Sequence, residues 1–275
     1  MNKNLISVNT LKEDLLNDNL IILDATIPKA GDKNFISTTE CIPNSYFFDL
    51  KKIFSEQNSK FPNTVPSKEQ FETHAKSLGI NSDSKIIIYD QHGIYSSPRA
   101  WWLLKLMGHE NVFVLDGGLK AWIKNNLETE STFKTPCIIG NFEATINPEL
   151  ISTKEDVLNS IKAQSHLIID ARSSKRFLAL IDEPRKGLRS GHIPNSKNLH
   201  YASLTENEHL KSNIELTQLF NTLKLGNKQL IYSCGSGITA CILALAGSQI
   251  GIDNFSIYDG SWSEWGALHE LPIEK

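Results

Sequence analysis

The 275-residue sequence lacks the features that mark secreted, membrane-spanning and nucleic-acid-binding proteins. Its four cysteines are scattered and form no Cys-x-x-Cys pair, which argues against a disulfide framework and a zinc site. No run of about 18 apolar residues occurs, and the N-terminus lacks the apolar stretch of a secretory signal. The net charge of -3 gives no reason to expect nucleic acid or an anionic membrane as a partner. We therefore expect a cytoplasmic protein that needs no metal.

The composition is that of an ordinary globular protein. Hydrophobic residues make up 40% of the chain and charged residues 21%, which excludes disorder and a fibrous repeat. At roughly 100–200 residues per domain, this length predicts two domains, each able to bury a core.

The two predicted domains are copies of one another, because segments of the first half recur in the second. LIILDAT resembles the later HLIIDAR, CIPNSYFF resembles HIPNSKNL, and VLDGGLKAW resembles IYDGSWSEW. The spacing of 27 residues from Tyr89 to Asp116 returns between Tyr232 and Asp259. We place the domains at 1–127 and 149–275. The stretch between them, 128–148, has two prolines and little periodicity, and is the predicted linker.

Within each half, short β-branched runs alternate with helix-like segments, which predicts an α/β fold with a mostly parallel sheet flanked by helices. The predicted strands are 20–23, 85–89 and 112–115, then 167–169, 229–232 and 255–258. The predicted helices are 67–78, 97–107, 153–161 and 239–250. Ser67 and Thr153 are the expected N-caps of two of these helices.

The chemistry is predicted at Cys234, where a strand runs into a Gly-rich loop that opens a helix. That geometry aims successive backbone N–H groups at one point, beside the positive end of the helix dipole. A thiol there is expected to ionise readily, and Gly235 and Gly237 would let the backbone curl around the sulfur. The alternative is that Cys234 is a packed core residue, which is our interpretation of the other three cysteines.

Two other kinds of site share part of this pattern. Gly235-x-Gly237-x-x-Ala240 fits a dinucleotide-binding fingerprint, but only 35 residues follow Ala240, too few to complete the βαβαβ unit. A cysteine phosphatase needs an Arg at the sixth position after the Cys, and that position is Ala240. We therefore disfavour both.

The tandem halves and the motifs DAR, GHIP, CGSGxTA and DGSWxEW resemble the two-domain rhodanese superfamily, over essentially the whole chain. Within that superfamily, the CGSGxTA loop is similar to 3-mercaptopyruvate sulfurtransferases. Thiosulfate sulfurtransferases usually carry basic residues directly after the Cys, where this sequence has the neutral Gly235 and Ser236.

The resemblance implies a reaction in two steps. Cys234 takes the sulfane sulfur of 3-mercaptopyruvate and becomes a persulfide, and pyruvate leaves as its enolate. A thiol acceptor, such as thioredoxin or a small thiol, or cyanide, then removes the sulfur. The loop N–H groups would stabilise the thiolate and persulfide anions, and no metal or organic cofactor is required. The residues that supply these groups are Gly235, Ser236, Gly237, Ile238 and Thr239.

The resemblance also implies that Arg176 and Arg185 bind the carboxylate and ketone of the substrate, for which the guanidinium fork is suited. The alternative is that both are solvated surface side chains, which is our interpretation of Arg189. Arg172 is either functional or part of a structural ion pair. His192 is expected to be structural. Ser236 would donate to the developing enolate or to its proton relay, or else only order the loop.

The sequence departs from its relatives in one place. Many mercaptopyruvate enzymes pair the loop Ser with an Asp and a His from the first domain. Here Lys51 stands where the acid is expected and Asn63 where the His is expected, which argues against a Ser-His-Asp relay. Protonation by water or by the thiol proton remains open.

The first half has no nucleophile at the equivalent place, since Gln91 stands in register with Cys234. This half is expected to shape a cleft between the domains. The candidate lining residues are His92, Tyr95, Ser96 and Arg99. Two functional alternatives remain, a thiosulfate sulfurtransferase and a non-catalytic binding module of the same fold.

Overall fold

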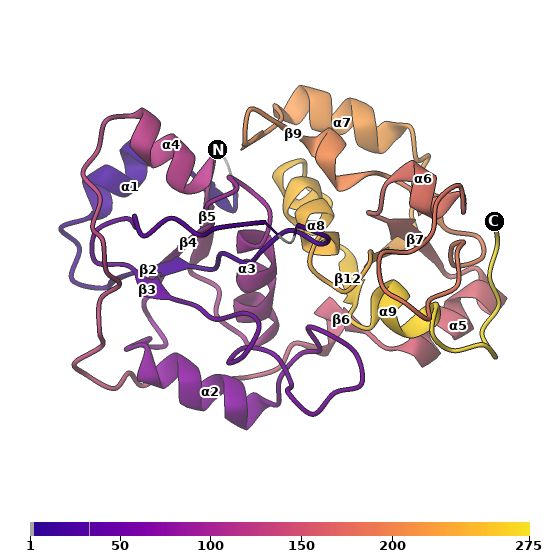
Figure 1. The fold of residues 1–275 in the computed structure, drawn as a ribbon, viewed down its shortest axis with the longest axis horizontal. Coiled ribbons are helices and arrows are strands. Elements are labelled where there is room, and N and C mark those ends of the chain that lie inside the picture. The colour runs from indigo at the N-terminus through magenta and orange to yellow at the C-terminus, as the bar shows by residue number, and fades with distance from the viewer. Residues whose placement is uncertain (1–2, 33) are drawn as a thin grey trace. The chain divides into compact units, whose positions relative to one another are not determined.

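The computed structural model describes residues 3–32 and 34–275, which form two compact units (Figure 1). Unit 1 consists of Met1–Gln57, Val65–Asn147 and Asn207–Leu210. Unit 2 consists of Asn58–Thr64, Pro148–Glu206 and Lys211–Lys275. Among the described residues, no helix combines the length and the apolar character that crossing a bilayer requires.

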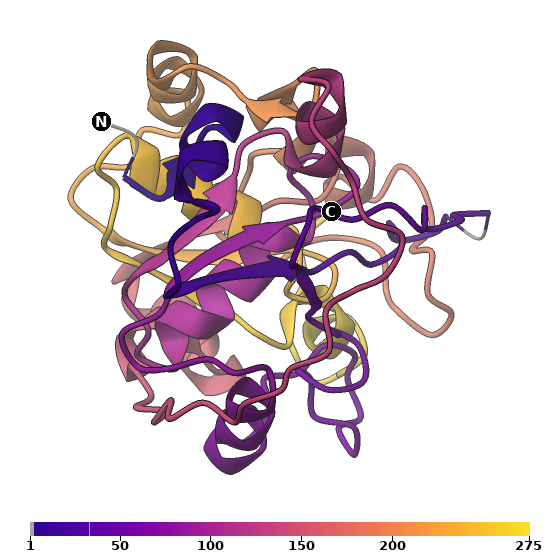
Figure 2. The same ribbon diagram turned by 90° about the vertical axis from the view of Figure 1, so that its left-hand side faces the viewer.

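Unit 1 is built on a five-stranded parallel sheet with the strand order β1-β5-β4-β2-β3. The strands are β1 (Leu5–Ile6), β2 (Leu20–Asp24), β3 (Tyr46–Phe47), β4 (Lys85–Tyr89) and β5 (Val112–Leu115). The helices are α1 (Val8–Asp14), α2 (Lys68–Ser77), α3 (Ser97–Leu106) and α4 (Gly118–Lys124), and β10 (His209–Leu210) also belongs here. Helices cover both faces of the sheet (Figure 2). Ile22, Ile87 and Leu115 pack in one buried cluster with Leu11 of α1 and Trp122 of α4.

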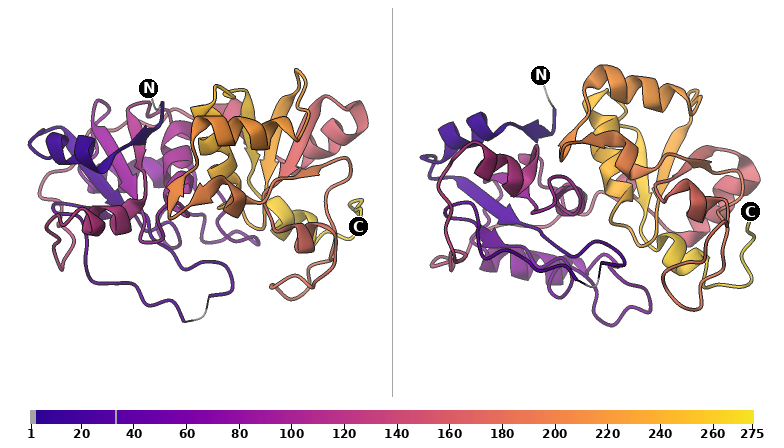
Figure 3. Two further views of the ribbon diagram at one scale, coloured as in Figure 1. Left: turned by 90° about the horizontal axis from the view of Figure 1, so that it is seen from above. Right: turned by 45° about the horizontal axis from the view of Figure 1, so that its top comes forward.

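Unit 2 repeats the same strand order, β6-β12-β11-β7-β8, and its pairings are again parallel. Figure 3 shows this unit, coloured from salmon to yellow, with helices beside its sheet. The strands are β6 (Ile151–Ser152), β7 (His166–Asp170), β8 (Lys197–Asn198), β9 (Thr205–Glu206), β11 (Gln229–Ser233) and β12 (Phe255–Tyr258). The helices are α5 (Lys154–Ala163), α6 (Ser174–Phe177), α7 (Asn213–Asn221), α8 (Ala240–Gln249) and α9 (Ser261–Trp265), with 3-10 turns η1 (Pro148–Leu150) and η2 (Tyr201–Leu204). The identical order confirms the predicted tandem α/β repeat.

The predicted elements form within one or two residues of their expected ends. The Ser67 side chain accepts the N–H of Gln70, and Thr153 forms a capping box with Asp156, as their spacing predicts. Helix α8 is buried along its whole length, because its sequence ACILALAGSQ offers no charged face to water. Its packing against β11 and β12 holds the loop that precedes it.

Of the predicted linker 128–148, Pro148 begins the main part of unit 2 and residues 128–147 fall in unit 1. Phe142 is buried there, with its ring centroid 6.0 Å from that of Phe71, and the backbones of Glu130 and Cys41 pair. These anchors are isolated along an extended chain, so they leave no periodic signal in the sequence. Cys137, in the same segment, is exposed, which corrects its assignment to the core.

Candidate active site

Cys234 directly follows β11, the central strand of the unit 2 sheet, and is buried. The loop from Cys234 to Thr239 connects this strand to α8, as predicted. The start of α9 holds the cysteine backbone. Ser261 Oγ accepts the N–H of Cys234 at 3.2 Å, and the N–H of Trp262 donates to the Cys234 carbonyl at 3.0 Å. Ser261 Oγ also lies 4.0 Å from the cysteine Sγ.

The loop presents four backbone N–H groups that are not used within the described part of the protein. Within the described residues, the N–H groups of Gly235, Ser236, Ile238 and Thr239 donate to no protein acceptor. Gly237 has φ +76°, in the left-handed region that favours glycine. These donors stand at the positive end of α8, which is an arrangement suited to an anion.

The corresponding loop of unit 1 contains an anion of its own, the Asp90 carboxylate. Its Oδ2 accepts the N–H groups of Tyr95, Ser96 and Ser97 at 2.8, 2.9 and 2.9 Å, and Ser97 Oγ at 2.7 Å. His92 N–H donates to the other oxygen at 2.9 Å. A loop of this shape in this same protein therefore binds a negative charge through backbone N–H groups.

Asp90, rather than Gln91, is the structural counterpart of Cys234, which corrects the prediction. Tyr89 pairs with Asp24 as Ser233 pairs with Asp170. The Asp90 carbonyl accepts the N–H of Leu119, just as the Cys234 carbonyl accepts that of Trp262. The unit 1 loop is one residue longer before its helix, and an ungapped sequence match shifts the strand end by that residue.

The other first-half candidates belong to unit 1. Tyr95 OH accepts the N–H of Ala30 at 3.0 Å, and a ring nitrogen of His92 contacts the Ile27 carbonyl at 2.9 Å. Ser96 and Arg99 are buried. Their predicted role in lining a substrate pocket stays a prediction.

Arg176 and Arg185 converge on the backbone of Gly235. A Cβ atom placed on Gly235 would lie 3.2 Å from Arg176 Nη2 and 3.7 Å from Arg185 Nη1. The two loop glycines thus have different roles, because Gly235 makes room for guanidinium groups whereas Gly237 permits the turn. Arg185 Nη1 is further held by Ser263 Oγ at 3.2 Å.

Glu183, which sequence reasoning missed, fixes both Arg176 and Arg172. Its carboxylate accepts Arg176 Nε and Nη2 at 3.1 and 2.5 Å, and Arg172 Nη1 at 2.8 Å. Arg176 uses its side edge for these bonds, so the end of its fork, Nη1 with the second Nη2 hydrogen, still faces away from Glu183. A lone glutamate in an irregular loop carries no sequence signal for this role.

Arg172 forms a structural ion pair, one of the two predicted alternatives. It is buried, bonds Asp170 Oδ2 through Nη2 at 2.6 Å, and lies 4.2 Å from the Trp262 ring centroid. Burial opposes its charge, but Asp170 and Glu183 together raise the pKa of Arg172. Because Asp170 and Glu183 already pair with its guanidinium, Arg172 has a structural role and holds Glu183 in place beside Arg176.

Arg189 and His192 also have structural partners. Arg189 donates to four backbone carbonyls, including Trp265 and Leu268 at 2.8 and 2.6 Å, so it is not the solvated side chain we expected. It closes the turn after α9, where orphan carbonyls collect. His192 stacks on Phe177 at 3.8 Å, and its Nδ1 contacts the Phe177 carbonyl at 2.8 Å.

Two residues at η2 adjoin the site and were not predicted. Burial raises the pKa of Tyr201; the nearby charge of Arg176 opposes this shift, and Cys234 adds to it. Burial and Arg176 both lower the pKa of His200. Both side chains are therefore neutral at pH 7, and the phenol of Tyr201 keeps its proton beside Arg176 and Cys234. The sequence could have indicated the two residues at η2, because they closely follow β8 and so lie at the same end of the parallel sheet as Cys234.

Ser236 is held by two donors. Asn63 Nδ2 lies 2.9 Å from its Oγ and 2.9 Å from its carbonyl oxygen, and Arg185 Nη2 lies 3.0 Å from Oγ. Asn63 comes from the short segment Asn58–Thr64, which belongs to unit 2 although it precedes most of that unit in sequence.

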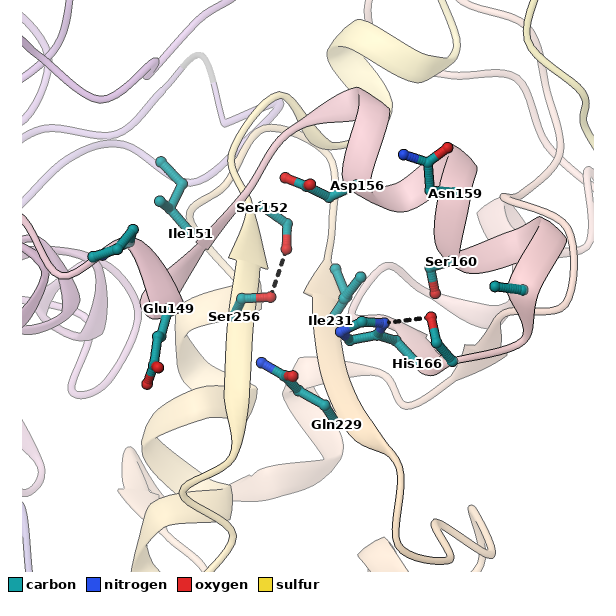
Figure 4. A pocket seen from close by; sticks show the side chains of 13 residues that line it. Glu149, Ile151, Ser152, Asp156, Asn159, Ser160, His166, Gln229, Ile231 and Ser256 are labelled. Carbon is teal, nitrogen blue, oxygen red and sulfur yellow. Dashed lines mark hydrogen bonds between the residues drawn. The ribbon is translucent and has the colours of Figure 1, made fainter.

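A pocket of about 320 Å³ also occurs in unit 2, between α5 and the sheet (Figure 4). It is lined by polar groups that include Ser160, His166 and Gln229. His166 and Gln229 begin β7 and β11, whereas Cys234 follows the end of β11. This pocket is therefore at the opposite end of the sheet from the cysteine, and it does not hold the reacting sulfur.

Comparisons with known proteins agree with the repeat. The chain matches the rhodanese-like domain over residues 7–125 and again over 153–268. It is 37% identical over 275 residues to the 3-mercaptopyruvate sulfurtransferase of Escherichia coli strain K12, covering 98% of this chain and 97% of that protein. It is 35% identical to thiosulfate/3-mercaptopyruvate sulfurtransferase 1, mitochondrial, of Arabidopsis thaliana, covering 98% of this chain and 77% of the relative. The crystal structure of SseA from Escherichia coli, a 3-mercaptopyruvate sulfotransferase, has a TM-score of 0.85 at 34% identity, covering 94% of this chain and 98% of that chain.

Proposed function

We propose, since the chain belongs to the rhodanese-like domain family and is a sulfurtransferase, that it transfers the sulfane sulfur of 3-mercaptopyruvate through a persulfide on Cys234 to a thiol acceptor. The observation that carries the proposal is the convergence of Arg176 and Arg185 on Gly235, the residue next to the cysteine. A 2-oxo acid presents a carboxylate and a ketone oxygen, and two adjacent guanidinium groups match these acceptors.

Substrate binding uses the free end of the Arg176 fork. Glu183 occupies the side edge and fixes the plane of the guanidinium, so the remaining N–H groups are pre-oriented for a carboxylate. Arg185 contributes its charge beside the ketone oxygen. The N–H groups of the loop are left for the sulfur anion.

The first half-reaction forms one bond and breaks one. The Cys234 thiolate attacks the sulfur of the substrate, an S–S bond forms, and the C–S bond breaks with its electron pair leaving on pyruvate as an enolate. Cys234 is then a protonated persulfide. Transfer of that proton to the enolate carbon completes pyruvate and leaves the persulfide anion in the loop.

The second half-reaction returns the enzyme to its starting state. A thiol, such as thioredoxin or a small thiol, or cyanide attacks the outer sulfur and carries it away, and Cys234 is released as its thiolate. The loop N–H groups stabilise the Cys234 thiolate as well as the persulfide anion, so the sulfur is not trapped in the persulfide state.

Two alternatives keep a specific basis. A thiosulfate sulfurtransferase is supported by the Arabidopsis relative, whose name includes both donors. A non-catalytic binding module is supported by unit 1, where Asp90 stands at the place of Cys234. There the loop forms the same turn without a nucleophile.

Intact-mass spectrometry tests the function directly. Incubation with 3-mercaptopyruvate should add one sulfur, about 32 Da, and Cys234→Ser should abolish the increment. Cys241→Ser is the matched control, since Cys241 is buried in the first turn of α8, and it should retain the increment. Steady-state turnover of both donors with cyanide then decides the donor. Faster turnover of thiosulfate would move the enzyme to the thiosulfate class, and absence of any adduct would leave the binding module.

A further inference from the structure

We propose that Asn63 is a positioning residue that makes Ser236 Oγ–H the proton donor to the departing enolate. The inference rests on the proposed function and assigns the proton path within it. Both side chains are buried, with Asn63 6% and Ser236 7% exposed, so water does not compete freely for their hydrogen bonds.

The direction of the hydrogen bonds follows from the chemistry of the partners. The Ser236 carbonyl can only accept, so the Asn63 atom 2.9 Å from it must be the amide nitrogen. The same nitrogen therefore also donates to Ser236 Oγ. Arg185 has no acceptor at all, so its contact with Oγ is a second donation.

These two donations leave one choice for the serine hydrogen. A hydroxyl oxygen has two acceptor positions and one hydrogen, and Asn63 and Arg185 fill both acceptor positions. The hydrogen must point toward a third group, and in the loaded enzyme the acceptor nearby is the substrate bound beside Gly235. Ser236 is thereby fixed as a donor.

The same pair of donors makes the proton transfer feasible. When Ser236 gives its proton to the enolate carbon, the oxygen becomes an alkoxide that the Arg185 charge and the Asn63 amide stabilise. The proton of the newly formed Cys234 persulfide then restores the hydroxyl, so one proton moves and none is gained or lost. No base is needed at position 63, where the amide does not titrate.

Asn63→Asp is the most informative variant. Asn63 has φ +63°, and Asp is, after Asn and Gly, among the residues that best tolerate this conformation, so the backbone is retained. The new carboxylate can only accept, so it turns the serine hydrogen away from the substrate and repels the Ser236 carbonyl. Asn58→Asp is the matched control, because it adds the same charge at an exposed position of the same segment.

The readout is the ratio of persulfide-forming turnover with 3-mercaptopyruvate to that with thiosulfate, since sulfite leaves without needing protonation at carbon. We expect Asn63→Asp and Ser236→Ala to lower this ratio by about 10²-fold or more, the size of general acid catalysis. Asn58→Asp should change it less than twofold. Asn63→His keeps an N–H donor, so its ratio should lie between that of Asn63→Asp and that of the wild type. Its ratio should also depend on pH, because the imidazole titrates and the wild-type amide does not.

Two results would distinguish a failure of the positioning role of Asn63 from a failure of the proposed function. If Asn63→Asp slows both donors equally, the positioning role is refuted while the proposed function stands. If the wild type forms no persulfide with either donor, the proposed function itself fails, and the mass measurement shows this independently of Asn63.

Discussion

Replacing Glu183 by Gln removes the buried charge that fixes two arginines of the site. Its side chain is 1% exposed and bonds Arg172 and Arg176 at 2.5–3.1 Å. Breaking a buried ion pair by removing one partner costs about 3–5 kcal/mol. Arg172 keeps Asp170, and Arg176 is 18% exposed and can be partly solvated, so we expect the loss of unfolding free energy to be about 2–3 kcal/mol.

Urea unfolding followed by tryptophan fluorescence measures this loss, because Trp262 lies against Arg172. The freed Arg176 also loses its orientation, so KM for 3-mercaptopyruvate should rise about tenfold. Glu110→Gln is the control, since the Glu110 side chain is 78% exposed in its ion pair with Lys105 and its loss should change neither quantity measurably. A Glu183→Gln protein as stable as the wild type, with the same KM, would refute the role given to this carboxylate.

Three further predictions concern the loop, the substrate fork and pH. Gly237→Ala should destabilise by about 1–2 kcal/mol in urea unfolding because its φ is +76°, whereas Gly235→Ala should mainly raise KM by crowding Arg176; the reverse pattern would contradict the roles given to the two glycines. Arg176→Lys keeps the charge but loses the fork, so KM for 3-mercaptopyruvate should rise at least tenfold with little change for thiosulfate, and an unchanged KM would remove Arg176 from the pocket. Burial raises the pKa of Asp24 to about 6, so the native state binds this proton more tightly than the unfolded chain, and the wild type loses stability as pH rises from about 4 to 6. Asp24→Asn should gain on the wild type by up to about 2 kcal/mol across that window, and a gap independent of pH would contradict it.

Much of the fold was predictable because its signals are local and periodic. Strands such as 85–89 and 112–115 are short β-branched runs, and the caps Ser67 and Thr153 depend only on residues three positions away. The segment 128–147 was not predictable, because an extended chain held by a few anchors such as Phe142 has no period to detect.

The correction at Asp90 has a different cause. Sequence offsets place residues by the commonest spacing, and one extra loop residue shifts the comparison by one position. Strand pairing and the carbonyl contact to Leu119 fix the equivalence because hydrogen bonds allow only one register.

The amino-acid sequence by itself determined the duplicated α/β architecture and the position of Cys234 at the end of a central strand, because strand, turn and helix signals act over a few residues. Only the tertiary structure decided that Glu183 binds two arginines and that Asn63 and Arg185 both donate to Ser236. Those roles depend on which donors and acceptors folding leaves unpaired at one place. Folding brings these donors and acceptors together from positions far apart in the sequence, so no local pattern of residues records them.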